Sequence, residues 1–244
     1  MTLRRCIIIT IVLATCAGAA HSQEAEPLEL ECLLEPHMTI KIGTPVPGAL
    51  AEVLVDRGEI VRKGQVVATL DTRAQAAAVE LSKARVEYTE RRMDRNEDLY
   101  RDELLSLQQK DEMETDAELA RLELLERETQ VEIRKIRSPI NGVVVDRLKG
   151  PGEYVQETEI LELAQIDPLN VEVVVPVQYF GRIKRGMTAE IRPEAPLDSV
   201  YEAKVRIVDK VIDAASGTFG VRLEIPNRDL AVPAGLRCSA RFAL

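Results

Sequence analysis

The sequence predicts a mostly β protein of the α+β class, in which a long antiparallel pair of helices interrupts a β-rich fold. Three observations lead to this prediction. Residues 65–138 contain neither glycine nor proline, the stretches on either side of that segment repeat one pattern, and the last part of the chain alternates apolar and polar residues. With 45% hydrophobic and 30% charged residues, the chain has the composition of an ordinary folded protein.

Composition and charge exclude several classes of function. The net charge is −9, only 3% of the residues are aromatic, and there is no tryptophan. Such a chain repels phosphate backbones and has few rings on which bases could stack, so we expect no nucleic-acid partner. Two histidines and four cysteines leave little material for a metal-dependent or Cys/His catalytic centre.

Residues 1–22 are expected to be a cleaved export signal. Arg4 and Arg5 precede a short apolar run, Cys6–Ala17, and small residues follow it. The run is shorter than the roughly 20 residues of a membrane-spanning helix. An uncleaved anchor and a lipid on Cys16 are the alternatives. Cleavage before Gln23 removes two positive charges, which takes the net charge from −9 to −11 and leaves an acidic, exported protein.

Residues 23–42 are predicted to form an N-terminal strand that joins the C-terminal β domain. Apolar residues occupy every second position and glutamates stand between them, which is typical of a strand with one buried face. The apolar positions are Leu28, Leu30, Cys32 and Leu34.

Residues 72–135 are predicted to form a coiled-coil hairpin. They include 12 Lys or Arg and 17 Asp or Glu, and they are rich in good helix formers. Apolar residues recur at spacings of three, four and seven, as in a narrow coiled-coil seam. These residues are Ala77, Leu81, Ala84 and Tyr88 in one stripe, Val79, Val86, Met93 and Tyr100 in a second, and Met113, Ala117, Ala120, Leu124 and Val131 in a third.

A break in this pattern divides the segment into two helices. The run Leu104–Leu107 interrupts the stripes, and Ser106 with Gln109 has the spacing of a capping box. We therefore expect antiparallel helices over about 72–103 and 107–135, each roughly 45 Å long. The periodicity by itself indicates shape and not binding, so a charged spacer is the simplest interpretation.

Residues 43–71 and 136–166, which flank the hairpin, repeat one pattern. A turn that ends in glycine is followed ten residues later by a second glycine and then by an apolar segment. The glycines are expected in turns where the backbone angle φ is positive. Neither copy can bury its apolar face alone, so we predict that the two pack together. The structural glycines are Gly48, Gly58, Gly64, Gly142 and Gly152.

Residues 167–244 are predicted to form a small β-barrel or sandwich. Apolar and polar residues alternate along three stretches, which indicates half-buried strands. The inward positions are Ala203, Val205 and Ile207, then Phe219, Val221, Leu223 and Ile225, then Leu236, Cys238, Ala240 and Phe242.

The repeated motifs resemble the two halves of a biotinyl/lipoyl domain. They are Pro45-Val46-Pro47-Gly48 with Gly58-Glu59-Ile60-Val61, and Pro139-Ile140-Asn141-Gly142 with Gly152-Glu153-Tyr154-Val155. In carrier proteins a modified lysine lies on the turn between the halves, and here the hairpin occupies that place. A split lipoyl-like domain with an inserted hairpin resembles the periplasmic adaptor (membrane fusion, HlyD-like) family of tripartite efflux and secretion systems, most of all its resistance–nodulation–division adaptors. Residues 211–235 are similar to the β-barrel signature of that family.

The resemblance implies a binding site at the hairpin tip. In the family, an Arg-x3-Leu-x6-Ser pattern near the tip is associated with docking to an outer-membrane channel. Arg95, Leu99 and Ser106 match this spacing. An arginine can bond acceptors on a partner helix, a leucine can fill a groove and a serine can cap or bond. Taken singly, each residue also has an ordinary explanation as a solvated charge, a seam residue and a helix cap.

The resemblance further implies a protein without enzymatic activity or cofactor. Such an adaptor links an inner-membrane transporter to an outer-membrane channel and assembles as a ring, which is expected to be a hexamer. Many efflux adaptors continue past the barrel into a membrane-proximal domain, whereas this sequence stops at Leu244. We therefore expect a reduced contact with the pump, made by the barrel. The transporter is expected to be of the resistance–nodulation–division type, with an ATP-driven or type I secretion system as the alternative. A periplasmic coiled-coil scaffold protein without a pump is the alternative class of function.

Cys32 and Cys238 are the only cysteines after residue 23. Both occupy apolar faces of predicted strands, so in an oxidising compartment we expect a disulfide between them. Closing a loop of about 200 residues would stabilise the fold by at most about 4–5 kcal/mol. Two separate buried thiols are the alternative. His37 and Met38 near Cys32 could bind a soft cation such as Cu(I), but packing and turn roles are the commoner use of such residues, and no metal is predicted.

Overall fold

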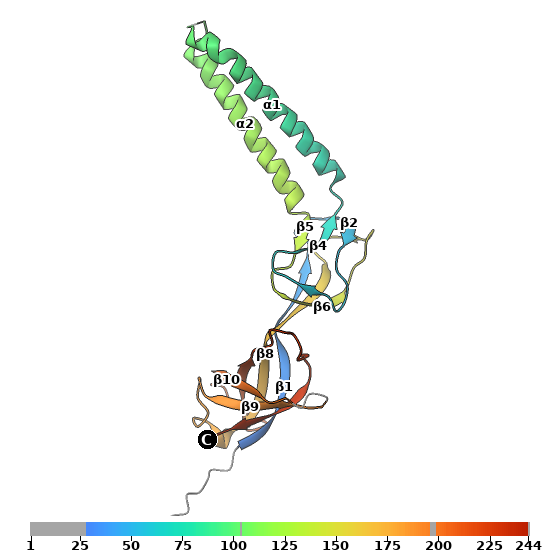
Figure 1. The fold of residues 1–244 in the computed structure, drawn as a ribbon, viewed down its shortest axis with the longest axis vertical. Helices are drawn as coiled ribbons and strands as arrows, with labels where there is room; N and C mark the ends of the chain where they lie inside the picture. The colour runs from blue at the N-terminus through green and yellow to red at the C-terminus, as the bar shows by residue number, and fades with distance from the viewer. Residues whose placement is uncertain (1–27, 103, 196–198, 244) are drawn as a thin grey trace, which may run out of the picture.

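The computed structural model describes residues 28–102, 104–195 and 199–243, so the predicted export signal lies outside the described residues. The molecule is elongated, with a β-barrel at one end, a β-sandwich in the middle and a two-helix hairpin at the other end (Figure 1). The predicted fold class is therefore confirmed. Among the described residues, no helix is both long enough and apolar enough to cross a bilayer.

Six strands close the barrel domain, in the order β1, β12, β9, β10, β11, β8 and back to β1. Their inward side chains form one buried cluster, as the alternation predicted. Ile207 is an exception, because a bulge between Val205 and Ile207 shifts the register and leaves Ile207 47% exposed. The strands are β1 (Leu28–Gly43), β8 (Glu159–Pro176), β9 (Thr188–Pro193), β10 (Tyr201–Val208), β11 (Thr218–Ile225) and β12 (Arg237–Phe242).

Two of these strands run through both β domains. β1 pairs with β8 from Cys32 opposite Val173, in the barrel, to Gly43 opposite Glu159, in the sandwich. The domain boundaries expected at 42/43 and 166/167 therefore fall inside continuous strands and not in linkers. A continuous antiparallel pair ties the two domains together by main-chain hydrogen bonds.

A buried asparagine strengthens this junction. Asn227 is 2% exposed, and its Nδ2 donates to the carbonyls of Ile166 and Val232, each at 2.9 Å. Its Oδ1 accepts from the Val232 N–H at 3.0 Å, and its own N–H donates to the Asp167 carboxylate at 2.9 Å. Polar groups of a buried amide need hydrogen-bond partners. These bonds hold the loop after β11 against β8, which runs from the sandwich into the barrel.

The sandwich domain is built from two copies that exchange their strands. Gly48 of the first copy pairs with Val155 of the second, and Val61 of the first pairs with Gly142 of the second. Their buried side chains form one joint core, so neither copy is a separate unit. The strands are β2 (Gly48–Val53), β3 (Ile60–Val61), β4 (Val66–Leu70), β5 (Lys135–Arg137), β6 (Gly142–Arg147) and β7 (Tyr154–Val155).

The glycines of the repeat serve two different purposes. Gly58, Gly64 and Gly152 have φ of +86°, as expected for their turns. Gly48 and Gly142 do not have positive φ, and for them the expectation is wrong. Gly142 is required by close approach instead, because a Cβ there would lie 2.2 Å from the carbonyl oxygen of Ala164.

The hairpin consists of α1 (Arg73–Arg101) and α2 (Leu107–Glu132), which leave the sandwich between β4 and β5. The second and third predicted stripes form the seam: Val79, Met113, Ala117 and Ala120 are buried. The first stripe faces solvent, with Leu81 74% and Tyr88 56% exposed. The polar residues Ser82 and Thr89 are buried in the seam, where the apolar residues of the first stripe were expected.

Candidate functional site

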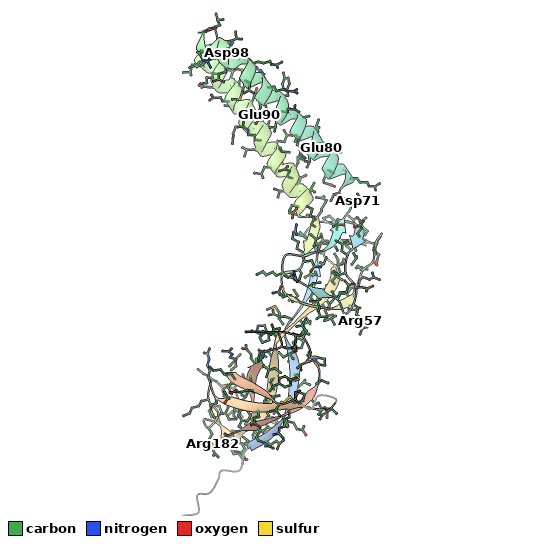
Figure 2. All side chains as sticks on the ribbon, viewed as in Figure 1. Arg57, Asp71, Glu80, Glu90, Asp98 and Arg182 are labelled. Atoms are coloured by element: carbon green, nitrogen blue, oxygen red, sulfur yellow. A yellow bond between two sulfur atoms is a disulfide. The ribbon has the colours of Figure 1, made fainter. Side chains whose placement is uncertain are left out.

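The three residues predicted to bind a partner lie at the far end of the hairpin. Arg95 and Leu99 are on the last two turns of α1, and Ser106 precedes α2. Asp98 marks this tip in Figure 2, and Asp71 marks the opposite, sandwich end. The Arg95 guanidinium makes no hydrogen bond or ion pair with any described residue. Leu99 is 40% exposed.

Ser106 is occupied by the turn itself. Its Oγ accepts a hydrogen bond from the Gln109 N–H at 3.3 Å and donates one to Gln109 Oε1 at 3.1 Å. The same Oε1 accepts from the Ser106 N–H at 3.0 Å. The predicted capping box is therefore confirmed. Because the hydroxyl already donates its proton, Ser106 can offer a partner only a hydrogen-bond acceptor.

Two further leucines extend the apolar surface of the tip. Leu104 is 71% exposed and Leu107 is 63% exposed. The Leu104 N–H donates to the Leu99 carbonyl at 2.9 Å, which holds the turn against the end of α1. In the sequence this run predicted only the helix break, and its exposed apolar surface was not predicted. A signal was available, since three leucines in four positions are unusual in so charged a hairpin.

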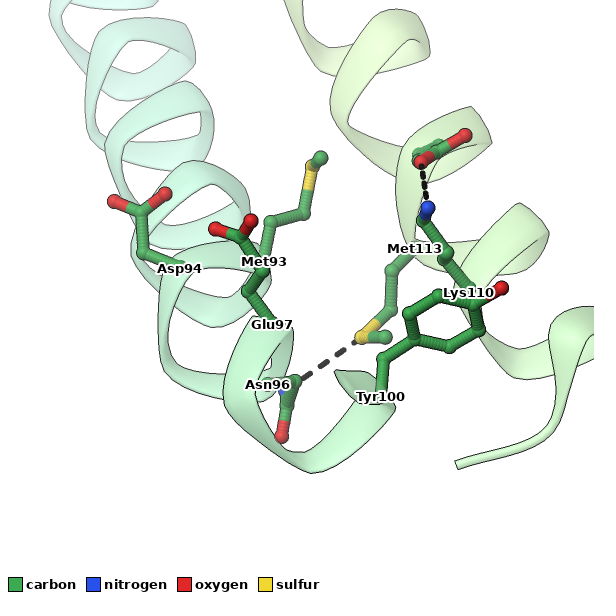
Figure 3. Close-up of a pocket in the computed structure, with 8 residues that line it drawn as sticks. Met93, Asp94, Asn96, Glu97, Tyr100, Lys110 and Met113 are labelled. Atoms are coloured by element: carbon green, nitrogen blue, oxygen red, sulfur yellow. Dashed lines mark hydrogen bonds and ion pairs between the residues drawn. The ribbon is translucent and has the colours of Figure 1, made fainter. Parts of the chain in front are cut away.

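A groove of about 270 Å³ opens between the helices near the tip (Figure 3). Met93, Tyr100 and Met113 give it an apolar lining, and Lys110 lies 4.4 Å from the centre of the Tyr100 ring. Carboxylates of Asp94, Glu97 and Glu114 also line it. Arg95 and Leu99 do not line the groove. Arg95 is two residues from Met93 and Leu99 is two residues from Glu97, so each side chain points about 200° around α1 from a residue that lines it. The tip therefore has two distinct surfaces.

Charged side chains fix the hairpin at its base. The Asp71 carboxylate accepts hydrogen bonds from the Arg73 N–H at 3.0 Å and from its guanidinium at 2.6 Å, which lowers the pKa of Asp71 to about 2. On the returning strand, Lys135 and Arg137 bond Glu132 and lower the pKa of that carboxyl. Each connection between the sandwich and the helices thus carries exposed ion pairs between residues close in sequence, which contribute modestly.

The structure joins Cys32 and Cys238 in a disulfide across β1 and β12. The two residues are directly opposite in register, with 4.8 Å between their Cα atoms and a sequence separation of 206. The Cys32 sulfur is therefore not free to act as a thiolate ligand beside His37 and Met38. Within residues 28–102, 104–195 and 199–243, no three His, Cys, Asp or Glu side chains gather as a metal site would need.

Comparisons with known proteins place this architecture among known folds. The MacA–MexA chimeric protein that contains the Pseudomonas aeruginosa MexA α-hairpin superposes with a TM-score of 0.73 at 19% identity, over 88% of this chain and 81% of the other. ZneB from Cupriavidus metallidurans gives 0.53 at 22% identity, over 88% and 97%. These similarities concern the fold alone.

One curated relative, an uncharacterized protein from Haemophilus influenzae, is 24% identical over 200 residues, which cover 81% of this chain. They cover 52% of the relative, so the chain spans about half the length of that protein.

Two domain families match almost the whole described chain. Residues 38–165 match the CzcB-like, barrel-sandwich hybrid domain, and residues 169–244 match the CusB-like, beta-barrel domain. The first match includes both copies of the repeat and the inserted hairpin, and the second includes the barrel strands β9 to β12. The chain belongs to the periplasmic adaptor, or membrane fusion protein, family.

Proposed function

We propose that the protein is a periplasmic adaptor that links an inner-membrane transporter to an outer-membrane channel in a tripartite efflux system. The observation that carries this proposal is the elongated shape with an exposed apolar tip. The 29 residues of α1 span about 44 Å and carry the tip away from the two β domains. The continuous β1–β8 pair that joins the two β domains suits a part that must hold two partners apart.

The tip supplies the contact with the channel. Leu99, Leu104 and Leu107 are exposed there, and burial of a whole leucine side chain is worth about 1.5–3 kcal/mol. The exposed guanidinium of Arg95 can donate to carbonyl or carboxylate oxygens on a partner helix. Ser106 contributes chiefly by fixing the turn that presents the leucines. This arrangement corresponds to an apolar anchor surrounded by polar groups.

The protein works without catalysis in this proposal. Its contribution is positional, and the transporter supplies the energy for export. Members of the adaptor family are typically non-enzymatic. We place the protein in the periplasm, which the family implies.

Several copies would surround the path of the exported substrate as a ring, and a hexamer is the proposed number. Exposed apolar side chains along both helices support side-by-side packing of hairpins, since each would otherwise stay in water. They are Leu81 and Tyr88 on α1, and Leu119, Leu122 and Leu125 on α2. The proposed transporter is of the resistance–nodulation–division type, with an ATP-driven transporter as the second candidate.

Charge substitutions at the tip test the proposal. Leu99→Asp and Arg95→Asp should each abolish recovery of the outer-membrane channel with the adaptor, while the circular dichroism spectrum stays unchanged. Leu54→Asp and Arg57→Asp are matched controls, because both residues are exposed on the sandwich domain. Wild-type recovery of the channel with both tip variants would refute the tip contact.

The inner-membrane partner is identified by mass spectrometry after gentle solubilisation of the same complexes. A resistance–nodulation–division transporter is the expected result, and an ATP-driven transporter would correct the class of pump. Complexes that contain no inner-membrane transporter would favour a scaffold and contradict the proposed function.

A further inference from the structure

The end of the barrel that faces away from the hairpin carries two loops side by side. β8 ends at Pro176, which is opposite Thr218 at the start of β11. The loops of residues 177–187 and 209–217 meet there, because the Val177 N–H donates to the Gly217 carbonyl at 2.9 Å. We call these two loops the basal face. Figure 2 marks it with Arg182, at the opposite end of the molecule from Asp98.

The basal face is positively charged although the chain as a whole is acidic. Its two loops hold four cations and two carboxylates, 4 − 2 = +2, in a chain of net charge −9. None of the four cations forms an ion pair with a described residue. They are Arg182, Lys184, Arg185 and Lys210, and all are exposed.

The carboxylates of these loops are partly used within the fold. Asp213 accepts hydrogen bonds from the Ala215 N–H at 2.9 Å and from the Ser216 hydroxyl at 2.7 Å. The Asp209 carboxylate lies against Gly220, where an added Cβ would meet its Oδ2 at 2.4 Å. Both carboxylates are nevertheless exposed, so they offset two of the four positive charges and the basal face presents a net charge of +2.

Apolar side chains stand among these cations. Val211 is 83% exposed, more than any other large hydrophobic residue that the structure describes. Phe180 is 46% exposed, although its ring also packs edge-on against Phe219 with 5.3 Å between the ring centres. Val177 and Ile212 are 44% and 38% exposed. Exposure of these apolar side chains to water is unfavourable, and together with four cations that form no ion pair with a described residue it indicates a binding surface.

We propose that the basal face binds the surface of an anionic phospholipid bilayer. Phosphate headgroups would pair with the four cations, and Val211 and its apolar neighbours would enter the boundary between headgroups and acyl chains. Exposed lysines and arginines interspersed with exposed apolar side chains match the two parts of a bilayer surface, the charged headgroups and the acyl chains beneath them. The proposal takes from the proposed function only the choice of membrane, the inner one. Lipid binding itself is a separate property.

Vesicle sedimentation tests the charge requirement. Protein recovered from the periplasm should bind vesicles of phosphatidylcholine with phosphatidylglycerol, bind vesicles of phosphatidylcholine alone much less, and dissociate as salt is raised. The triple substitution Lys184→Gln, Arg185→Gln and Lys210→Gln should weaken binding about a hundredfold, since each cation near an anionic surface contributes about fivefold.

A matched control removes the same charge elsewhere. Arg57→Gln, Arg62→Gln and Lys63→Gln neutralise three exposed cations on the turns of the sandwich domain, so this variant should bind close to wild type. Equal loss in both triple variants would mean that only net charge matters and would overturn the proposal. Equal binding to both kinds of vesicle would also overturn it, because that behaviour indicates an anchor or non-specific adsorption.

A tryptophan reporter tests insertion of the basal face. The chain has no tryptophan, so Val211→Trp gives a single signal. Its fluorescence should shift to the blue on anionic vesicles and be quenched by brominated lipid. Tyr154→Trp, at a position 67% exposed on the sandwich domain, should show neither change.

The remaining outcomes separate lipid from protein partners. Failure of the wild type to bind either kind of protein-free vesicle would overturn the proposal. Retention only on membranes that contain a transporter would assign the basal face to that protein instead. Recovery of the outer-membrane channel depends on the opposite end of the molecule, so loss of lipid binding with intact channel recovery leaves the proposed function standing.

Discussion

Reduction of the Cys32–Cys238 disulfide should destabilise the barrel strongly. The bond closes a loop of 206 residues, and the loss of chain entropy in the unfolded state corresponds to about 5 kcal/mol as an upper figure. For a chain of this size each kcal/mol shifts Tm by about 2–4 °C, so reduction should lower the midpoint of thermal unfolding by roughly 10–20 °C. Calorimetry of the protein with and without reductant measures this difference.

The position of the disulfide adds a spatial prediction. Both cysteines are buried where the first and last strands of the barrel meet. Hydrogen exchange after reduction should therefore accelerate in the barrel more than around Val61 and Val155 in the sandwich core. Reductant should have no effect on a Cys32→Ala/Cys238→Ala variant, which is the control. Equal midpoints for oxidised and reduced protein, or recovery of both residues as free thiols from the periplasm, would refute the reasoning.

Three further substitutions test the fold. Asn227→Ala leaves buried backbone groups of Ile166 and Val232 without partners and should cost about 2–4 kcal/mol in urea unfolding; a loss below about 1 kcal/mol would contradict the role given to this junction. Ser106→Ala should reduce the stability of the first turn of α2 by about 1 kcal/mol, seen as faster amide exchange there while the unfolding midpoint hardly moves. Gly142→Ala forces a Cβ against a backbone carbonyl and should cost more than about 2 kcal/mol, whereas Gly150→Ala, whose nearest neighbour is 3.7 Å away, should be nearly neutral in the same unfolding assay.

The sequence was sufficient for those parts of the fold that depend on local patterns. Period-two alternation predicted β11, where Phe219, Val221, Leu223 and Ile225 are all buried. The repeat predicted that the two flanks of the hairpin share a core, because each is too small to fold alone. The capping box at Ser106 predicted the start of α2 at Leu107.

Features that depend on strand register and on packing were not predictable from those patterns. A bulge turned Ile207 outward, and no residue type at that point marks it. Buried Ser82 and Thr89 made the seam partly polar, so the more apolar stripe with Leu81 was assigned to the wrong face. The leucines of residues 104–107 are an unusual cluster in the sequence, but the exposed fraction of Leu104 depends on the turn geometry.

Site-specific photo-cross-linking in cells tests the central claim most directly. A photoreactive amino acid at Leu104, on the tip, should capture an outer-membrane channel protein, and the same group at Val211, on the basal face, should not. Capture of the channel from position 211 and not from position 104, or no channel from either end, would contradict the assignment of the hairpin tip as the docking surface.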